Sequence, residues 1–183
     1  FDKAHNIFID ENGFLYAFGG SQGSDTAPYG VMILNLNNDP MNPTLEGSFD
    51  DFYLHDGMVR DNMLWGSAIY EGVFIVINVS DKSNPYIMSS HPTSCNFTHN
   101  AWISDDGNTL FTTDEQTGCY IGAYDVSDIY DIEILDQIQS WSGLGNVVPH
   151  NTHVAGNYLV TSYYTDGVTI VDASDPSNLV EVG

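Results

Sequence analysis

A string that begins with histidine followed by Asn or Asp recurs four times along the chain. The four strings lie at residues 5–9, 55–59, 99–103 and 150–154. Self-similarity at a period of about 20–50 residues is the sequence signature of repeat architectures, in which each copy is one structural unit. The repeat therefore predicts four copies of one unit within the 183 residues.

Each copy follows the same four-part pattern. A polar turn and a second apolar segment follow the histidine string, and a third segment opens with Gly-Val in three of the four copies. A turn containing Asp, Asn or Pro then precedes a fourth short segment, because Asp caps such a turn while Pro ends the preceding strand. The second segments are 14–18, 63–68, 109–113 and 158–163, the third are 30–34, 72–77, 119–124 and 167–171, and the fourth are 44–49, 86–90, 133–139 and 179–182.

Four short segments rich in Val, Ile, Tyr and Phe, with no helical periodicity, are typical of one propeller blade. We therefore predict an all-β chain that forms a β-propeller with four four-stranded blades, at about residues 3–53, 54–97, 98–149 and 150–183. A β-sandwich is the alternative, but it would not repeat the pattern four times. Because closed propellers generally have more than four blades, we expect a fragment of a longer chain. Its blades would be half of a seven- or eight-bladed ring, completed by further sequence or by another chain.

The chain is strongly acidic, with 3 Lys and Arg residues against 25 Asp and Glu residues and a formal net charge of −22. This balance argues against a nucleic-acid partner, because phosphate binding needs clustered cations. There is no apolar run of about 18 residues, so we expect no membrane insertion. The acidic residues sit mostly in turns, where they are expected to be solvated. Capture of a divalent cation such as Ca²⁺ is the alternative.

The only two cysteines are Cys95 and Cys119. They could pair across neighbouring strands if the protein is exported, or both could stay reduced. Their number alone does not decide between these states.

Three strings in the second half of the chain carry a family resemblance. Residues 110–115 read Leu-Phe-Thr-Thr-Asp-Glu, residues 162–168 read Ser-Tyr-Tyr-Thr-Asp-Gly-Val, and residues 171–176 read Val-Asp-Ala-Ser-Asp-Pro. With the repeated histidine starts, they resemble the LVIVD-repeat proteins, specifically the choice-of-anchor B group. The resemblance spans essentially the whole chain and implies an exported bacterial propeller, secreted or displayed on the cell surface. It says little about activity.

The repeated histidines are the strongest candidate site. The first strand of each propeller blade lines the central channel, so the four imidazoles should form a ring near one mouth, where they could bind Zn²⁺ or another transition ion. The alternative is structural, since a polar residue at the start of an inner strand usually bonds nearby backbone while the next Asn or Asp caps a turn. Candidate metal ligands are His5, His55, His99 and His150, and candidate ligand-binding residues are these four with Asn6, Asp56, Asn100, Asn151, Asp114 and Glu115.

Other possible sites are weaker. His153 should point to the side of its strand opposite His150, so these two do not form a chelating pair. Asp114 and Glu115 could act together as acid and base only if a bulge or another blade brought them to one face. Trp65, Trp102, Trp141, Tyr163 and Tyr164 could form a carbohydrate-stacking face, although aromatic residues in strands more often pack in a core.

The sequence contains no nucleophile elbow, phosphate-binding loop, dinucleotide fingerprint or His-Glu-x-x-His motif, so we assign no catalytic residue. We expect a non-catalytic binding or scaffold module outside the cell, with a protein, a glycan or other chains of a surface assembly as its partner. The alternative is a metal-binding or metal-dependent hydrolase propeller that uses the channel-mouth histidines. The cofactor would then be a divalent metal, Ca²⁺ or Zn²⁺.

Overall fold

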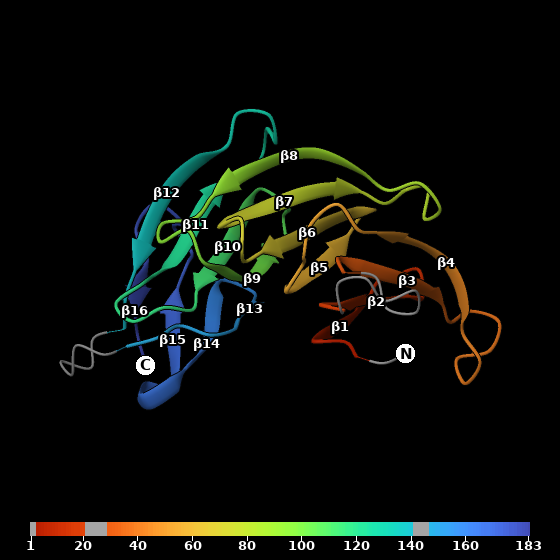
Figure 1. The fold of residues 1–183 in the computed structure, drawn as a ribbon. Coiled ribbons are helices and arrows are strands. Elements are labelled where there is room, and N and C mark those ends of the chain that lie inside the picture. The colour runs from red at the N-terminus through yellow and green to blue at the C-terminus, as the bar shows by residue number, and fades with distance from the viewer. Residues whose placement is uncertain (1–2, 21–28, 141–146) are drawn as a thin grey trace.

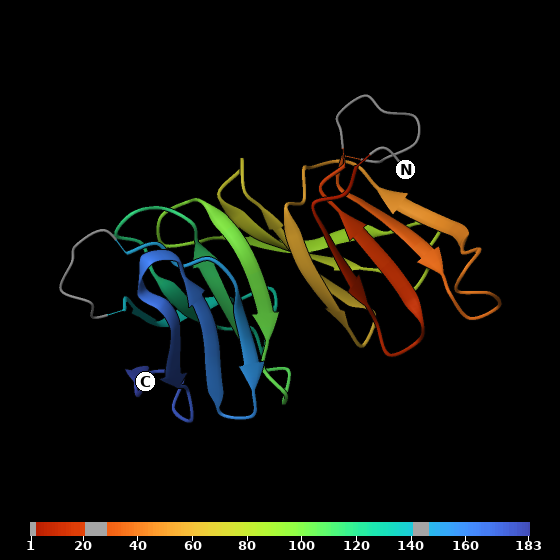
Figure 2. The same ribbon diagram turned by 90° about the horizontal axis from the view of Figure 1, so that it is seen from below.

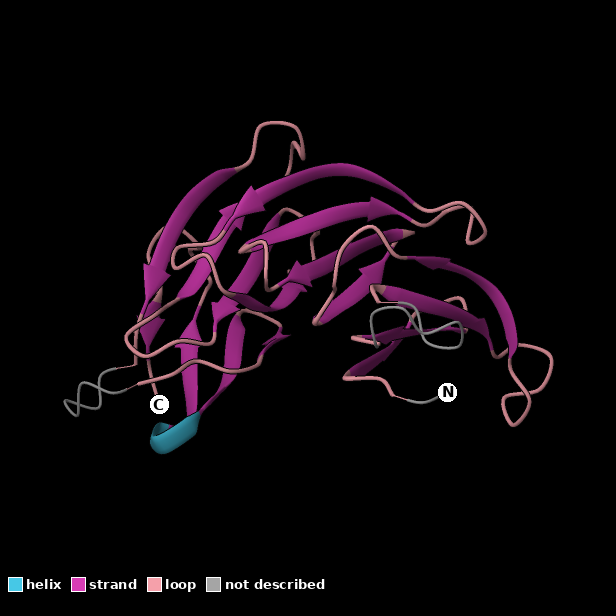
Figure 3. Ribbon diagram, viewed as in Figure 1, coloured by secondary structure: helices cyan, strands magenta, loops and turns pink. Residues whose placement is uncertain are grey.

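The computed structural model describes residues 3–20, 29–140 and 147–183. Its sixteen strands form four separate four-stranded antiparallel sheets, each made of four consecutive strands in chain order. Figure 3 shows these strands and one short 3₁₀ helix, η1 (Tyr164–Asp166). The prediction of an all-β propeller with four four-stranded blades is therefore confirmed.

The strands lie close to the segments predicted from the repeat. Blade one contains β1 (Asn6–Ile9), β2 (Phe14–Phe18), β3 (Val31–Asn35) and β4 (Thr44–Phe49). Blade two contains β5 (Asp56–Arg60), β6 (Met63–Ala68), β7 (Val73–Asn78) and β8 (Tyr86–Pro92). Blade three contains β9 (Thr98–Ile103), β10 (Thr109–Asp114), β11 (Ile121–Asp125) and β12 (Glu133–Ile138). Blade four contains β13 (Thr152–Ala155), β14 (Tyr158–Tyr163), β15 (Gly167–Asp172) and β16 (Val180–Glu181).

The blades fan out along an open arc (Figure 1). The first strands β1, β5, β9 and β13 lie along its concave side, and each contacts the first strand of the next blade. Figure 2 shows blades one and four at opposite ends of the arc. The concave side is therefore the channel side of the propeller, and it is lined by the four histidine-led strings.

Apolar side chains fill the space between neighbouring blades. Along β6, Leu64 and Ala68 pack against blade one, whereas Trp65, the residue directly after Leu64, packs against blade three. This alternation follows from the two-residue period of a strand, which places successive side chains on opposite faces. Each inner blade therefore buries both of its faces, but only because it has a neighbour on each side.

The outer faces of the two end blades lack this cover. On blade four, Tyr158 and Val168 expose 47% and 63% of their surface. Leu159, which follows Tyr158 and points to the opposite face, is fully buried. On blade one, Ile7 and Ile9 are 58% and 52% exposed. Within the described part of the chain, these are the faces against which a further blade would pack.

Many of the acidic residues cap turns. The carboxylates of Asp39, Asp81, Asp128 and Asp175 each accept a hydrogen bond from the backbone N–H two residues further on, at 2.9–3.1 Å. Side-chain and backbone hydrogen bonds hold the pKa of Asp39 and of Asp81 below the usual range of a carboxyl. The repeated Asp of the turn is therefore a backbone cap, as predicted.

Two of the three basic side chains join blade two to its neighbours. The Nζ atom of Lys82 lies 3.9 Å from a carboxylate oxygen of Asp10 in blade one. The guanidinium of Arg60 donates to the backbone oxygen of Ser104 at 2.5 Å and lies 3.7 Å from Asp105, both in blade three. These contacts place both cations at blade boundaries.

A disulfide joins Cys95 to Cys119. Cys95 lies between β8 and β9, and Cys119 between β10 and β11, so the bond ties the entry of blade three to its second turn. The pairing that the sequence left open is therefore present. No helix among the described residues is long and apolar enough to span a membrane.

Replacing both cysteines by alanine should lower the free energy of unfolding by about 2–4 kcal/mol, because the cross-link spans 24 residues and restricts the unfolded chain. Denaturant unfolding of the two proteins measures the difference. A reducing agent should produce the same loss in the native chain and none in the double variant. Equal stability of the oxidised native chain and the double variant would show that the bond contributes nothing.

Candidate functional site

The histidines of the four strings lie side by side on the channel side of the arc. The ring centroids are 3.8 Å apart for His5 and His55, 4.5 Å for His55 and His99, and 4.3 Å for His99 and His150. We call these four residues the histidine row. The imidazoles come together as the repeat suggests, but they follow the open arc of the described blades and do not close into a ring.

His99 is the most buried member of the row, with 2% of its surface exposed. Its Nδ1 atom lies 3.0 Å from the backbone oxygen of His150. Because a carbonyl oxygen only accepts, Nδ1 carries the hydrogen, and Nε2 of the neutral ring has a free lone pair. Burial, followed by the neighbouring His150, lowers the pKa of His99 to about 4, so the ring is neutral at pH 7.

Glu115 follows the last residue of β10, beside a bulge at His99: Thr113 pairs with Asn100 and Asp114 with Thr98, so His99 is the extra residue of β9. One carboxylate oxygen lies 3.4 Å from Nε2 of His99, and the other lies 3.8 Å from Nε2 of His150. The Tyr164 hydroxyl, held by the 3₁₀ turn of blade four, donates a hydrogen bond to this carboxylate. The side chain therefore faces both imidazoles from a fixed position.

These three side chains form a group of metal-ligand type. Ligand atoms of His99, Glu115 and His150 all lie within 4.8 Å of one another. Ligands about 2.0–2.1 Å from a tetrahedral Zn²⁺ are about 3.3–3.4 Å apart, close to the shorter of the two nitrogen–oxygen distances. A lone pair on His99 facing a carboxylate is unfavourable unless a proton or a metal ion lies between them, and burial disfavours the protonated ring. The arrangement can therefore hold a cation.

The other half of the row forms a second group. Ligand atoms of His5, His55 and His99 also lie within 4.8 Å of one another. The Nδ1 atom of His55 is 3.4 Å from the Tyr53 hydroxyl, and its Nε2 atom is buried without a hydrogen-bond partner. Burial and the neighbouring histidines lower the pKa of His55 to about 3. His99 thus belongs to both groups.

The Asn and Asp residues that follow the histidines form hydrogen bonds between blades. The structural alternative expected them to cap turns, which they do not do. Asn6 and Asn100 donate from their side-chain amides to the two carboxylate oxygens of Asp56, at 2.5 and 2.9 Å. The side-chain oxygen of Asn100 accepts from the backbone N–H of Thr152 at 3.0 Å. The predicted residues Asn6, Asp56 and Asn100 therefore link all four blades, and with Asn151 we call them the amide row.

Asp114 lies apart from the histidine row. It is 1% exposed, and its carboxylate accepts hydrogen bonds from the Thr93 hydroxyl at 2.5 Å, from the Phe97 N–H at 2.8 Å and from the Cys95 N–H at 3.2 Å. It thus holds the turn that carries the disulfide. The bulge in this region lies at His99 of β9 and not between Asp114 and Glu115, so the two carboxylates stay in different surroundings.

The aromatic residues do not share one face. Trp65 and Tyr163 are buried in the cores between blades, and Tyr164 is 59% exposed beside Glu115. Trp102 lies on the channel side and contacts the ring of His153. Trp141 falls outside the described residues.

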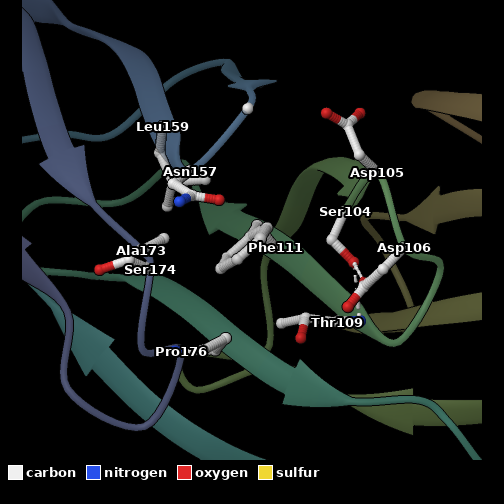
Figure 4. A pocket seen from close by; sticks show the side chains of 11 residues that line it. Ser104, Asp105, Asp106, Thr109, Phe111, Asn157, Leu159, Ala173, Ser174 and Pro176 are labelled. Atoms are coloured by element: carbon white, nitrogen blue, oxygen red, sulfur yellow. Dashed lines mark hydrogen bonds between the residues drawn. The ribbon is translucent and has the colours of Figure 1, made fainter.

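A separate pocket of about 230 Å³ lies between blades three and four, at the far end of β9 from His99 (Figure 4). The side chains of Ser104, Phe111, Asn157 and Pro176 line it. Asp106 also lines it, but its carboxylate already accepts from the Ser104 hydroxyl at 2.6 Å. This pocket contains no member of the histidine row.

Tyr164 was predicted only as part of a carbohydrate-stacking face, and Ser162 was not predicted as a site residue. Tyr164 holds Glu115, and the Ser162 hydroxyl lies 3.5 Å from Nδ1 of His150. Both belong to one of the strings that carry the family resemblance, at 162–168. Neither position stands out in the fourfold repeat, so the repeat gave no reason to assign them to the histidines.

Comparison with known proteins agrees with the repeat and the fold. The family described as LVIVD repeat matches residues 68–93 and 150–183. No curated protein matches the sequence.

Similar solved structures include the periplasmic gluconolactonase of Pseudomonas aeruginosa, with a TM-score of 0.72 and 14% identity over 100% of this chain and 56% of that chain. The hydrazine synthase of Kuenenia stuttgartiensis has a TM-score of 0.69 and 13% identity, over 98% of this chain and 49% of that chain. A protein from Lactobacillus plantarum has a TM-score of 0.65 and 11% identity, over 98% of this chain and 55% of that chain. This chain thus spans about half the length of each, and the likeness at these identities concerns the fold alone.

The histidine row should make folding stability depend on pH. His55 and His99 have folded pKa values of about 3 and 4, below the ordinary 6.5 of histidine. Below pH 6.5 the unfolded chain binds protons that the folded chain does not, so stability should fall as the pH drops from about 6.5 towards 4. Urea unfolding midpoints across this range measure the slope.

Changing His55 and His99 together to glutamine should flatten this slope. The matched control is His91→Gln, because His91 lies outside the row, and its slope should equal that of the native chain. An unchanged slope in the double variant would contradict the placement of neutral, buried imidazoles in the row.

Proposed function

We propose that this chain, an LVIVD-repeat β-propeller, is a binding module whose ligand is a divalent transition-metal ion held by His99, His150 and Glu115. One observation carries the proposal. Two imidazole Nε2 atoms face one carboxylate at 3.4 and 3.8 Å, and the hydrogen of His99 is committed to a carbonyl on the other side of its ring. A metal ion between them would turn this repulsion of lone pairs into coordination.

Each proposed ligand has a partner that orients it. The backbone oxygen of His150 fixes the ring of His99, the Tyr164 hydroxyl holds Glu115, and the Ser162 hydroxyl lies beside His150. Metal-bound histidine almost always donates its other ring N–H to such a partner, which sets the tautomer. The three side chains are thus supported as ligands.

The donor set selects the type of metal. Two imidazole nitrogens and one carboxylate suit Zn²⁺ and other first-row transition ions, whereas Ca²⁺ takes 6–8 oxygen ligands. Of the two metals expected from the sequence, Zn²⁺ is therefore the better match. A fourth position would stay open to water or to a group of a partner, which suits a binding module. Metal-dependent hydrolysis would also need a general base, and Glu115 serves here as a ligand.

We also propose that the protein acts in a bacterial extracytoplasmic location, secreted or on the cell surface. The Cys95–Cys119 disulfide supports this, because such bonds persist in oxidising compartments. The uncovered faces of blades one and four support completion of the ring by further blades, from the same polypeptide or from another chain. A protein or glycan partner would then approach the open metal position from the channel mouth.

Isothermal titration of the chelator-treated protein with Zn²⁺ tests the metal site. We expect one tight site per chain, and Glu115→Gln or His99→Gln should weaken binding at least tenfold, because each removes one of three protein ligands. Matched controls are Glu133→Gln and His91→Gln, which should leave the affinity unchanged. Equal affinity in the native chain, E115Q and H99Q would overturn the proposal, provided that circular dichroism shows both variants folded.

Tyr164→Phe tests whether Glu115 is held in place for the metal. Loss of the hydroxyl should weaken Zn²⁺ binding by about 10–100-fold, the usual effect of removing an outer partner of a ligand. The side chain is 59% exposed, so folding should not suffer. Substituted Co²⁺ should show an altered visible absorption spectrum in the variant, whereas an unchanged spectrum and affinity would remove Tyr164 from the site.

A further inference from the structure

A second pocket opens on the channel side, next to the histidine row. It has a volume of about 200 Å³ and is lined by members of the amide row together with Phe8, Trp102 and His153. These aromatic residues stand two positions after Asn6, Asn100 and Asn151 on the same first strands. Residues two apart on a strand point to the same side, so the amide row and the aromatic side chains form one surface. We call this cavity the channel pocket.

The carboxylate of Asp56 is the chemical centre of the channel pocket. It is 3% exposed and accepts hydrogen bonds from the Asn6 amide, the Asn100 amide and the Gly57 N–H, at 2.5, 2.9 and 2.6 Å. All three partners are donors, which is the arrangement expected of an ionised carboxylate. None of them carries a charge, and burial raises the pKa of Asp56 against the opposing effect of these hydrogen bonds.

Among the described residues, no Lys or Arg forms a salt bridge with this carboxylate, although the neighbouring His5 favours its ionised form. Arg60 pairs with Asp105, and Lys82 pairs with Asp10. A buried charge is costly unless an opposite charge or a metal offsets it. Asp56 therefore has the surroundings of a group that receives its positive partner from outside the chain.

The other wall of the channel pocket is aromatic. The Trp102 ring lies 6.0 Å from the ring of Phe8 and 4.3 Å from that of His153, both in edge-to-face geometry. Trp102 is only partly buried, so it is accessible from the pocket. Aromatic faces attract organic cations and pack against their carbon atoms, whereas a bare metal ion gains little from such a wall. The volume also exceeds that needed by a single ion.

We propose that the channel pocket binds a small organic ammonium ion, with its charged group at Asp56 and its carbon skeleton against Trp102 and Phe8. The side-chain oxygen of Asn151 is buried without a hydrogen-bond partner and can accept from the ammonium group. The ligand class is therefore a primary or secondary amine that keeps N–H donors and carries an apolar group. This site uses other side chains than the metal site and does not depend on it.

Titration with 2-phenylethylammonium, and with 2-phenylethanol as an uncharged molecule of similar shape, tests the proposal. The 183-residue chain should bind the ammonium ion, and the alcohol at least tenfold more weakly, because only the cation compensates Asp56. Calorimetry and tryptophan fluorescence report the affinity. Failure of the ammonium ion to bind, or equal binding of the two compounds, would overturn the proposal.

Two variants locate the binding. Asp56→Asn keeps the size of the side chain but removes its charge and should weaken ammonium binding at least tenfold. Trp102→Leu keeps the charge and should weaken it about threefold to thirtyfold through the lost aromatic face. Thermal melting checks that each variant is folded, and retained affinity in both folded variants would place the binding elsewhere.

The control variant is Glu115→Gln, which should leave ammonium binding unchanged while it weakens Zn²⁺ binding. This separates failure of the pocket from failure of the metal site. Ca²⁺ added in excess should not displace the ammonium ion. Displacement by Ca²⁺ would assign the pocket to an inorganic cation and contradict the ligand class proposed here.

Discussion

The packing of each blade against the next is the interaction on which the rest of the structure depends. A four-stranded sheet with apolar residues on both faces cannot bury them alone, and here Leu64 and Trp65 of one strand enter two different cores. Stacking the blades brings the first strands of neighbours into contact in the same orientation. Residues that hold the same place in the repeat therefore become neighbours in space.

The histidine row and the amide row are direct results of this stacking. A single imidazole at the start of a strand would be an ordinary polar side chain. Four imidazoles on successive blades instead create surroundings in which burial and the neighbouring rings keep His55 and His99 neutral. The same stacking buries the carboxylate of Asp56 between two amides. A chain with 25 acidic residues and 3 Lys and Arg residues thus gathers hydrogen-bond acceptors along its channel.

The fold could be predicted from the sequence because the repeat is local. The predicted segments 63–68 and 158–163 coincide with β6 and β14, since alternating apolar residues and turn caps define these strands without reference to the rest of the chain. The closeness of the four histidines could also be predicted, because it needs only the stacking of equivalent strands. The curvature of the row could not be predicted, because it depends on the angle at which neighbouring blades pack.

The parts of the site outside the repeat could be predicted only in part: Glu115 was a candidate together with Asp114, but the sequence did not tell which of the two reaches the histidines. Glu115 lies just past the end of β10, beside a bulge at His99 of β9, and a bulge leaves no clear signal in a single sequence. Tyr164 arrives from a 3₁₀ turn of the next blade. The Cys95–Cys119 pairing likewise depends on the turn that Asp114 holds, which is a tertiary contact between residues 17–21 positions apart.

Anomalous X-ray diffraction at the zinc absorption edge, on crystals of the chain prepared with Zn²⁺, tests the central claim most directly. If blade stacking builds the metal site, one strong anomalous peak should lie between Nε2 of His99, Nε2 of His150 and the carboxylate of Glu115. Zinc found only at the acidic surface turns, with the three side chains uncoordinated, would contradict the account.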